Sequence, residues 1–195
     1  LEKYNVICFI LKADFTVKPQ IIKFMDKLKE YRIDSLINNA GSYIKSRHFT
    51  NLTFEDMIKT FMVNTFTSIF LASNLFIKMK ERVFGRIVNI SSISAKYGGS
   101  AYSLHYGSSK RALEGLTKTL AKEGAEHNIL VNTIRPGVID TEFHKRFPKD
   151  MSNRINMIPV KRMGKPEDIA EIACYLGSER NEFITNEIIT IAGGE

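Results

Sequence analysis

Apolar and polar residues follow two different periods along this chain. Short apolar runs of β-strand length cover residues 5–15, 34–41, 85–92, 129–137 and 186–194. Between them, apolar residues recur at helical spacing over residues 18–32, 54–82, 103–126 and 165–179. Strands that alternate with helices of ten or more residues are typical of parallel βαβ units. The pattern therefore predicts one α/β domain over residues 1–195, built on a doubly wound parallel sheet.

Two of the predicted helices carry local start signals. Thr53 precedes the helix at 54–82, and Asp56, three residues on, forms a variant of the capping box. Pro166 falls in the first turn of the helix at 165–179, where the missing N–H of proline costs nothing. These signals support the predicted starts of both helices.

Polar and glycine-bearing segments follow three of the predicted strands directly. They are NNAG (38–41), NISS (89–92) and RPGVIDT (135–141). In a doubly wound sheet, ligands bind beyond the carboxyl ends of the parallel strands, which meet at one edge. The sequence therefore predicts a binding site where these three segments converge.

Composition and charge narrow the classes of function. The chain is 44% hydrophobic, which suffices for one core, and apolar runs such as VICFIL (6–11) are too short to span a bilayer. The formal net charge is +7, but no basic run exceeds two residues, which favours a lysine-rich surface over nucleic-acid binding. An anionic cofactor or an acidic partner would also benefit from this charge. Cys8 and Cys174 lie in apolar-patterned segments, so we expect buried thiols in a reducing, cytoplasmic compartment, and neither a disulfide nor a metal site.

A tyrosine and a lysine stand four positions apart in HYGSSKRAL (105–113). On a helix this spacing puts Tyr106 and Lys110 on one face, one turn apart. Such a pair is expected by chance about 0.6 times in a chain of this composition, so an ordinary surface helix is the alternative interpretation. A catalytic site is favoured because other candidate segments accompany the pair in a fixed order along the chain: NNAG, Asn64, NISS and RPGVIDT.

In this order the segments resemble the short-chain dehydrogenase/reductase family, from Asp14 to the final AGG. The resemblance is most specific between Gly85 and Thr141, and PVKRMGKPEDIAEIACYLGSE (159–179) resembles the branch that includes the 3-oxoacyl-[acyl-carrier-protein] reductases. It implies a Rossmann-like fold and an NAD(P)-dependent oxidoreductase that moves a hydride between nicotinamide and a carbonyl or alcohol carbon.

The resemblance implies four catalytic residues, Asn64, Ser92, Tyr106 and Lys110. Tyr106 would be the general acid in carbonyl reduction, and Lys110 would lower the pKa of its phenol, which is ordinarily near 10. Ser92 would hold the substrate oxygen against Tyr106. Asn64 would bind a water that links Lys110 to solvent, whereas a mid-helix asparagine with a purely structural role is its alternative.

The neighbours of Ser92 invite confusion with it. Strand alternation points Ser91 and Ser92 to opposite faces, so we do not expect both to serve. Ser94 is a weaker candidate, because the interval from Ser92 to Tyr106 is one residue longer than the family leads us to expect. His105 and His144 carry no signal that marks either as an acid–base group.

The resemblance also implies the contacts of an NAD or NADP cofactor, with NADP slightly preferred. They fall on Asp14, Phe15, Asn39, Ala40, Gly41, Tyr106, Lys110, Pro136, Gly137, Ile139 and Thr141. Asp14 and Phe15 would touch the adenine, although a turn-capping aspartate beside a core phenylalanine explains the same pair. Residues 39–41 would face the ribose, where small side chains let the backbone approach a ligand. Residues 136–141 would face the nicotinamide.

The stretch 142–164 resembles a mobile substrate lid. Its apolar members could cover a hydrophobic substrate, and its basic members could meet an anionic one; the basic members are Lys145, Arg146, Lys149 and Arg154. A solvated loop with ordinary anchors explains the same residues equally well.

One departure from the family is large, because the glycine-rich TGxxxGxG turn that receives a pyrophosphate is absent from the sequence. We expect an N-terminally truncated domain that lacks its first βαβ unit, with exposed sheet edges and weak cofactor affinity. A non-catalytic scaffold that kept the fold is the alternative to an enzyme. By resemblance, helices 54–82 and 103–126 would form the interface of a homotetramer or homodimer, whose partner otherwise is a small carbonyl or alcohol substrate.

Overall fold

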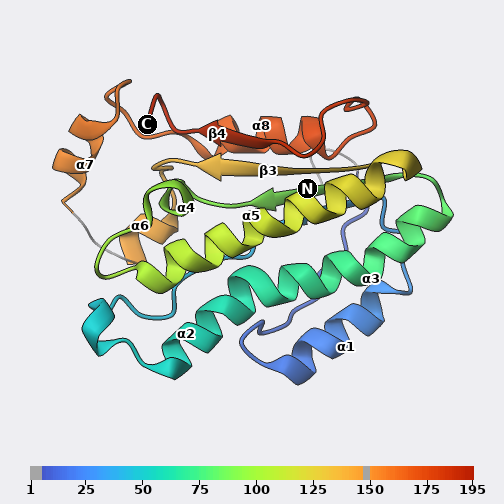
Figure 1. Ribbon diagram of the computed structural model, residues 1–195, viewed down its shortest axis with the longest axis horizontal. Helices are drawn as coiled ribbons and strands as arrows, with labels where there is room; N and C mark the ends of the chain where they lie inside the picture. The colour runs from blue at the N-terminus through green and yellow to red at the C-terminus, as the bar shows by residue number, and fades with distance from the viewer. Residues whose placement is uncertain (1–5, 147–149) are drawn as a thin grey trace.

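The sheet has four parallel strands in the order β1-β2-β3-β4 in the computed structural model, which describes residues 6–146 and 150–195 (Figure 1). The strands are β1 (Ser35–Asn38), β2 (Gly85–Ile90), β3 (Ile129–Pro136) and β4 (Ile188–Ile191). Each of the four lies within a predicted strand. The strands β2 and β3 are buried along nearly their whole length, which explains their apolar patterns. The predicted α/β fold with a parallel sheet is confirmed.

Helices cover both faces of this sheet. The α-helices are α1 (Lys18–Leu28), α2 (Phe54–Phe61), α3 (Thr67–Glu81), α4 (Ile93–Tyr97), α5 (Leu104–Gly124), α6 (Glu142–Arg146), α7 (Met151–Met157) and α8 (Pro166–Leu176). The other helical segments are η2 (Phe49–Asn51), η3 (Met62–Phe66) and η4 (Ala125–His127). Figure 1 shows α1, α3 and α5 on one face of the sheet, while α8 lies on the other.

Strand alternation divides the core between the two faces. Ile87 of β2 packs in one cluster with residues of α1, α3 and α5, and its neighbour Val88 packs in a second cluster with α8. This arrangement is the doubly wound architecture that the sequence predicted.

The helix that begins at Phe54 continues to Glu81 through the π-helical turn η3. The Thr53 hydroxyl accepts the N–H of Asp56 at 3.1 Å, which confirms the predicted cap. By length and composition, residues 54–81 could cross a membrane, although the short apolar runs predicted no such segment. Leu71, Leu75 and Met79 nevertheless pack into the core, which is how the central helix of a globular domain behaves.

Two sequence predictions need correction here. Residues 6–15 form no strand, and Ile7, Phe9 and Ile10 are largely exposed, because no strand among the described residues pairs with this segment. Cys8 and Cys174 are exposed thiols, since the first lies in that segment and the second on the outer side of α8. The predicted lid contains two short helices, α6 and α7, and its residues 147–149 lie outside the described residues.

Candidate active site

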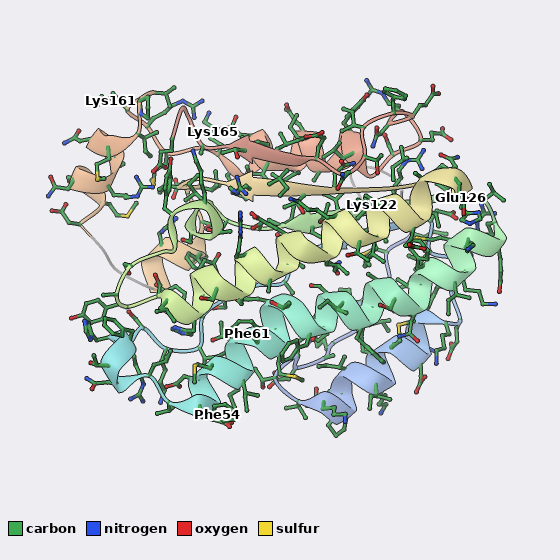
Figure 2. All side chains as sticks on the ribbon, in the orientation of Figure 1. Phe54, Phe61, Lys122, Glu126, Lys161 and Lys165 are labelled. Atoms are coloured by element: carbon green, nitrogen blue, oxygen red, sulfur yellow. The ribbon has the colours of Figure 1, made fainter. Side chains whose placement is uncertain are left out.

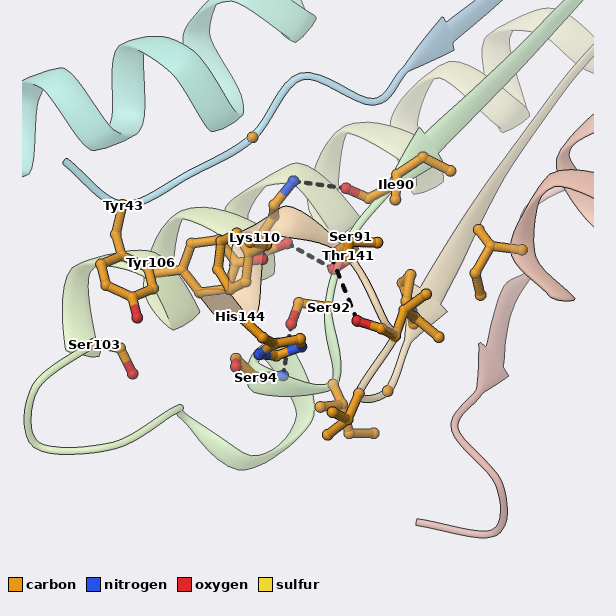
Figure 3. A pocket seen from close by; sticks show the side chains of 18 of the residues that line it. Tyr43, Ile90, Ser91, Ser92, Ser94, Ser103, Tyr106, Lys110, Thr141 and His144 are labelled. Carbon is orange, nitrogen blue, oxygen red and sulfur yellow. Dashed lines mark hydrogen bonds between the residues drawn. The ribbon is translucent and has the colours of Figure 1, made fainter. Parts of the chain in front are cut away.

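A cavity of about 360 Å³ opens at the carboxyl ends of β1, β2 and β3 (Figure 3). Its walls include residues from all three strand exits that the sequence singled out, such as Gly41, Ser92 and Gly137. The predicted convergence of these segments is therefore confirmed. Helix α5 supplies Tyr106 and Lys110 to the same cavity, and the lid helices α6 and α7 close one side of it.

Lys110 is only 2% exposed although it carries an amine. Its Nζ donates a hydrogen bond to the Ile90 carbonyl at 2.7 Å, which fixes the side chain across the end of β2. Burial lowers the pKa of Lys110 to about 8, because the charged form loses solvation. A Cβ atom on Gly41 would lie 2.6 Å from this Nζ, so the absence of a side chain at residue 41 makes room for the lysine.

Tyr106 lies one helical turn before Lys110 and lines the same cavity. Burial raises the pKa of its phenol, and a hydrogen bond with Ser92 lowers it by a smaller amount. The prediction that Lys110 makes this phenol acidic is therefore wrong for the structure as it stands, because desolvation of the phenolate outweighs its neighbours. The phenol stays protonated at neutral pH, which is the form that a proton donor requires.

The hydroxyls of the two adjacent serines have different partners, although Ser91, Ser92 and the weaker candidate Ser94 all line the cavity. Ser92 lines the cavity beside Tyr106, and its hydroxyl also accepts the N–H of Ser94 at 3.1 Å as the N-cap of α4. The Ser91 hydroxyl lies 2.9 Å from a carboxylate oxygen of Glu114 and 3.3 Å from the Lys110 carbonyl. Ser91 is thus engaged in packing α5 against β2.

Asn64 is fully buried in η3, behind Gly41. Its Nδ2 donates to the Ser42 carbonyl at 2.9 Å and to the Ser109 hydroxyl at 2.8 Å, and its Oδ1 accepts the Ser42 N–H at 2.8 Å. These bonds use both amide hydrogens and leave one lone pair on Oδ1. Asn64 therefore anchors the loop after β1, and π-helical turns often occur at functional sites.

Eight of the predicted cofactor residues line the cavity. They are Asn39, Gly41, Tyr106, Lys110, Pro136, Gly137, Ile139 and Thr141. Phe15 and Ala40 line a separate hollow beside β1, which Asn39 also reaches. Asp14 lines neither hollow, and its carboxylate accepts hydrogen bonds from the N–H and hydroxyl of Thr16 at 2.8 and 2.7 Å, in agreement with its alternative interpretation as a turn cap.

The sequence analysis missed an aromatic group around the phenol. The rings of Tyr43, Tyr106 and Phe143 contact one another with centroid distances of 5.5 to 5.7 Å. Tyr43 is 3% exposed, and burial raises its pKa to about 12. Its position two residues after NNAG is the one signal that could have pointed to it.

A buried carboxylate below the site was also missed. Glu114 lies one turn after Lys110 on α5, and its oxygens accept hydrogen bonds from Nε and Nη2 of Arg135, both at 2.9 Å. Because Arg135 immediately precedes Pro136, this pair joins the helix of the tyrosine and lysine to the strand exit at β3.

Comparison with known protein families identifies the family of this chain. The family model described as enoyl-(acyl carrier protein) reductase matches residues 2–195. The chain belongs to the short-chain dehydrogenase/reductase family. This membership makes it an enzyme of the NAD(P)-dependent oxidoreductase type and disfavours the scaffold alternative.

Two curated members of this family illustrate the similarity. The 3-oxoacyl-[acyl-carrier-protein] reductase of Aquifex aeolicus is 36% identical over 99% of this chain and 78% of its own length. The acetoacetyl-CoA reductase of Shinella zoogloeoides is 39% identical over 84% of this chain and 68% of its own length.

Solved structures of short-chain dehydrogenases/reductases agree with the fold. A 3-oxoacyl-(acyl-carrier-protein) reductase from Agrobacterium tumefaciens with NADP bound is 26% identical, with a TM-score of 0.85 over 95% of this chain and 73% of that one. A putative NAD(P)-dependent gluconate 5-dehydrogenase from Beutenbergia cavernae, also with NADP, is 25% identical, with a TM-score of 0.91 over 99% and 78%.

Proposed function

We propose that this chain reduces the carbonyl group of a small 3-oxoacyl or related substrate with NADPH. The observation that carries the proposal is the meeting of Tyr106, Ser92 and Lys110 in one cavity at the strand ends. The printed activities of the two curated relatives, reduction of 3-oxoacyl-[acyl-carrier-protein] and of acetoacetyl-CoA, support this class of substrate.

The cavity suits a nicotinamide dinucleotide. Among the described residues that line it, none is an aspartate or glutamate, and Lys110 lies at the strand ends, which favours a ligand that carries phosphates. Residues 39–41, Lys110 and residues 136–141 would hold it. We prefer NADP over NAD because both structural relatives described above were solved with NADP.

The nicotinamide would supply a hydride to the carbonyl carbon, and the side chains would handle the carbonyl oxygen. In this proposal the Ser92 hydroxyl donates a hydrogen bond to that oxygen, and Tyr106 transfers its phenolic proton to it as negative charge develops there. The raised pKa of Tyr106 keeps its proton in place at neutral pH, as does the ordinary pKa of a phenol. Lys110 donates one N–H to Ile90 and keeps two for a ribose hydroxyl. Asn64 is fully buried outside the lining of the cavity, so its proposed role in binding a water would need a change in its surroundings.

Substitution of the phenol tests this assignment. In Tyr106→Phe the ring stays and the proton donor is lost, so kcat for acetoacetyl-CoA with NADPH should fall by roughly 10²- to 10⁴-fold. Binding of NADPH, measured by fluorescence titration, should change little. Tyr102→Phe, which alters an exposed ring on the segment before α5, is the control and should leave kcat unchanged. Normal turnover by Tyr106→Phe would remove the proposed acid.

We also propose that two or four copies of the chain associate through the outer side of α2 and α3. Phe66, Phe70 and Ile77 repeat at helical spacing and are 38 to 61% exposed. Phe54 lies at the outer end of α2, away from the sheet (Figure 2). Light scattering should give a mass of two or four chains, and Phe70→Glu with Ile77→Glu should reduce it to one. A monomeric wild-type protein would contradict the proposal.

A cytoplasmic location stays a prediction.

A further inference from the structure

Arg154, on the lid helix α7, has no part in the carbonyl chemistry proposed above, yet it lines the same cavity as Tyr106 and Ser92. Figure 1 shows α7 beside the end of the chain that follows β4. The side chain of Arg154 is 23% exposed, so its guanidinium is largely removed from water. A cation held in this way needs acceptors close to it.

The hydrogen bonds of Arg154 leave part of its capacity unused. Its Nη2 forms an ion pair with a carboxylate oxygen of Glu195. Its Nη1 and the second carboxylate oxygen of Glu195 are both buried without a hydrogen-bond partner among the described residues, so the pair makes one hydrogen bond where two are possible. A buried donor without a partner is costly, and the planar guanidinium is suited to bind a carboxylate or phosphate through two parallel hydrogen bonds.

The charges around Arg154 favour an anion. Glu195 is the one acidic group that pairs with it among the described residues, and the backbone carbonyl of Glu195 also accepts a hydrogen bond from Lys96 at 3.3 Å. Lys161 donates to the carbonyl of Asn156 on the same helix α7. Among the described residues that line the cavity, Lys110 and Arg154 are cationic and none is an aspartate or glutamate.

We propose that Arg154 binds an anionic group of the substrate, a carboxylate on the carbonyl compound that Tyr106 protonates. The proposal rests on the proposed function, and it narrows the substrate class to oxo acids. A phosphate of the cofactor is the other source of an anion. The topology favours the substrate, because Glu195 follows β4 at one edge of the sheet, whereas the hollow lined by Phe15 and Ala40 lies beside β1 at the opposite edge.

Matched pairs of acids and esters test the proposal with the purified protein and NADPH. The probes are 3-oxobutanoate, 4-oxopentanoate and 5-oxohexanoate, each beside its neutral methyl ester, so that charge and its distance from the ketone vary separately. We expect at least one acid to exceed its ester tenfold in kcat/KM. Arg154→Gln should abolish this preference through KM and leave the rates with esters within twofold.

Two further variants should affect the preference for acids differently: one should increase it, and the other should leave it unchanged. Glu195→Gln removes the competing negative charge, so it should increase the preference for the acid. Arg162→Gln is the control, because the side chain of Arg162 is 60% exposed, pairs with Asp168 and lies outside this cavity. It should leave the preference unchanged.

The outcomes separate this inference from the proposed function. Equal use of acids and esters by the wild type, or an equal loss of both in Arg154→Gln, overturns the inference and leaves the reductase proposal intact. Weaker NADPH binding by Arg154→Gln with both substrate types would assign the anion to the cofactor instead. If no probe is reduced, calorimetric titration with the acids decides: binding that Arg154→Gln abolishes supports the inference, and binding that it retains, or no binding, overturns it.

Discussion

A methyl group at residue 41 should disable the site while sparing the fold. The Cβ of Gly41→Ala would lie 2.6 Å from Lys110 Nζ and 3.1 Å from its Cε, whereas ordinary contacts begin at 3.4 Å. The ammonium must therefore retreat by about 0.8 Å. The Gly41 backbone does not require glycine, since its φ lies outside the left-handed region, and the two nearest atoms are the flexible end of a lysine, with Asn64 Oδ1 third at 3.3 Å. The free energy of unfolding should thus change by less than about 1 kcal/mol.

The effect on activity should be much larger. Displacement of a positioned group by close to 1 Å costs roughly 10²-fold in rate, so kcat of Gly41→Ala should fall by about that factor. Urea unfolding and steady-state kinetics with acetoacetyl-CoA measure the two quantities on one preparation. Gly115→Ala, on α5 with open space around its Cβ position, is the control and should keep kcat and gain up to about 1 kcal/mol in stability. A Gly41→Ala protein with kcat within twofold of the wild type would refute the reasoning.

Two further predictions concern the groups next to this lysine. Glu114→Ala leaves the guanidinium of Arg135, whose side chain is 12% exposed, without its carboxylate, and should destabilise the chain by about 3 kcal/mol in urea unfolding. Arg111→Ala removes a 66% exposed partner of the same carboxylate and should cost less than about 1 kcal/mol, so equal losses would contradict the argument. For Lys110, the pKa of about 8 in the folded chain lies below its ordinary 10.5, so the unfolded chain binds more protons between these values and stability should rise with pH across that window. The rise, on the order of 3 kcal/mol, should be absent from Lys110→Met, and parallel pH profiles for the two proteins would exclude it.

Periodicity was sufficient for the elements that are long or buried on both sides. The strands β2 and β3 are rich in apolar residues and buried along nearly their whole length because helices cover both of their faces. Residues 6–15 have an equally apolar pattern and form no strand, since a strand also needs a neighbour to bond with, which no local pattern reveals. Helices α4, α6 and α7 have seven residues or fewer, too few for a helical period to emerge.

The site residues found from the sequence are those that follow strand ends or share a helix face. Glu114 was not assigned and the ion pair of Arg154 was not predicted, because their partners Arg135 and Glu195 lie 21 and 41 positions further along the chain. No spacing rule links such positions, and only the folded chain brings the charges together.

The phenol of Tyr106 marks the physical limit of spacing arguments. Four positions on a helix fix which groups are neighbours, but a pKa also depends on how much water each group retains. In water, a nearby ammonium would lower the pKa of the phenol. Here Lys110 is itself enclosed, and burial lowers its pKa while it raises that of Tyr106. Both shifts favour the uncharged forms of the two groups, because both groups are removed from water. Charge that develops on a bound carbonyl oxygen in the same cavity would also be poorly solvated, and transfer of the Tyr106 proton would neutralise it.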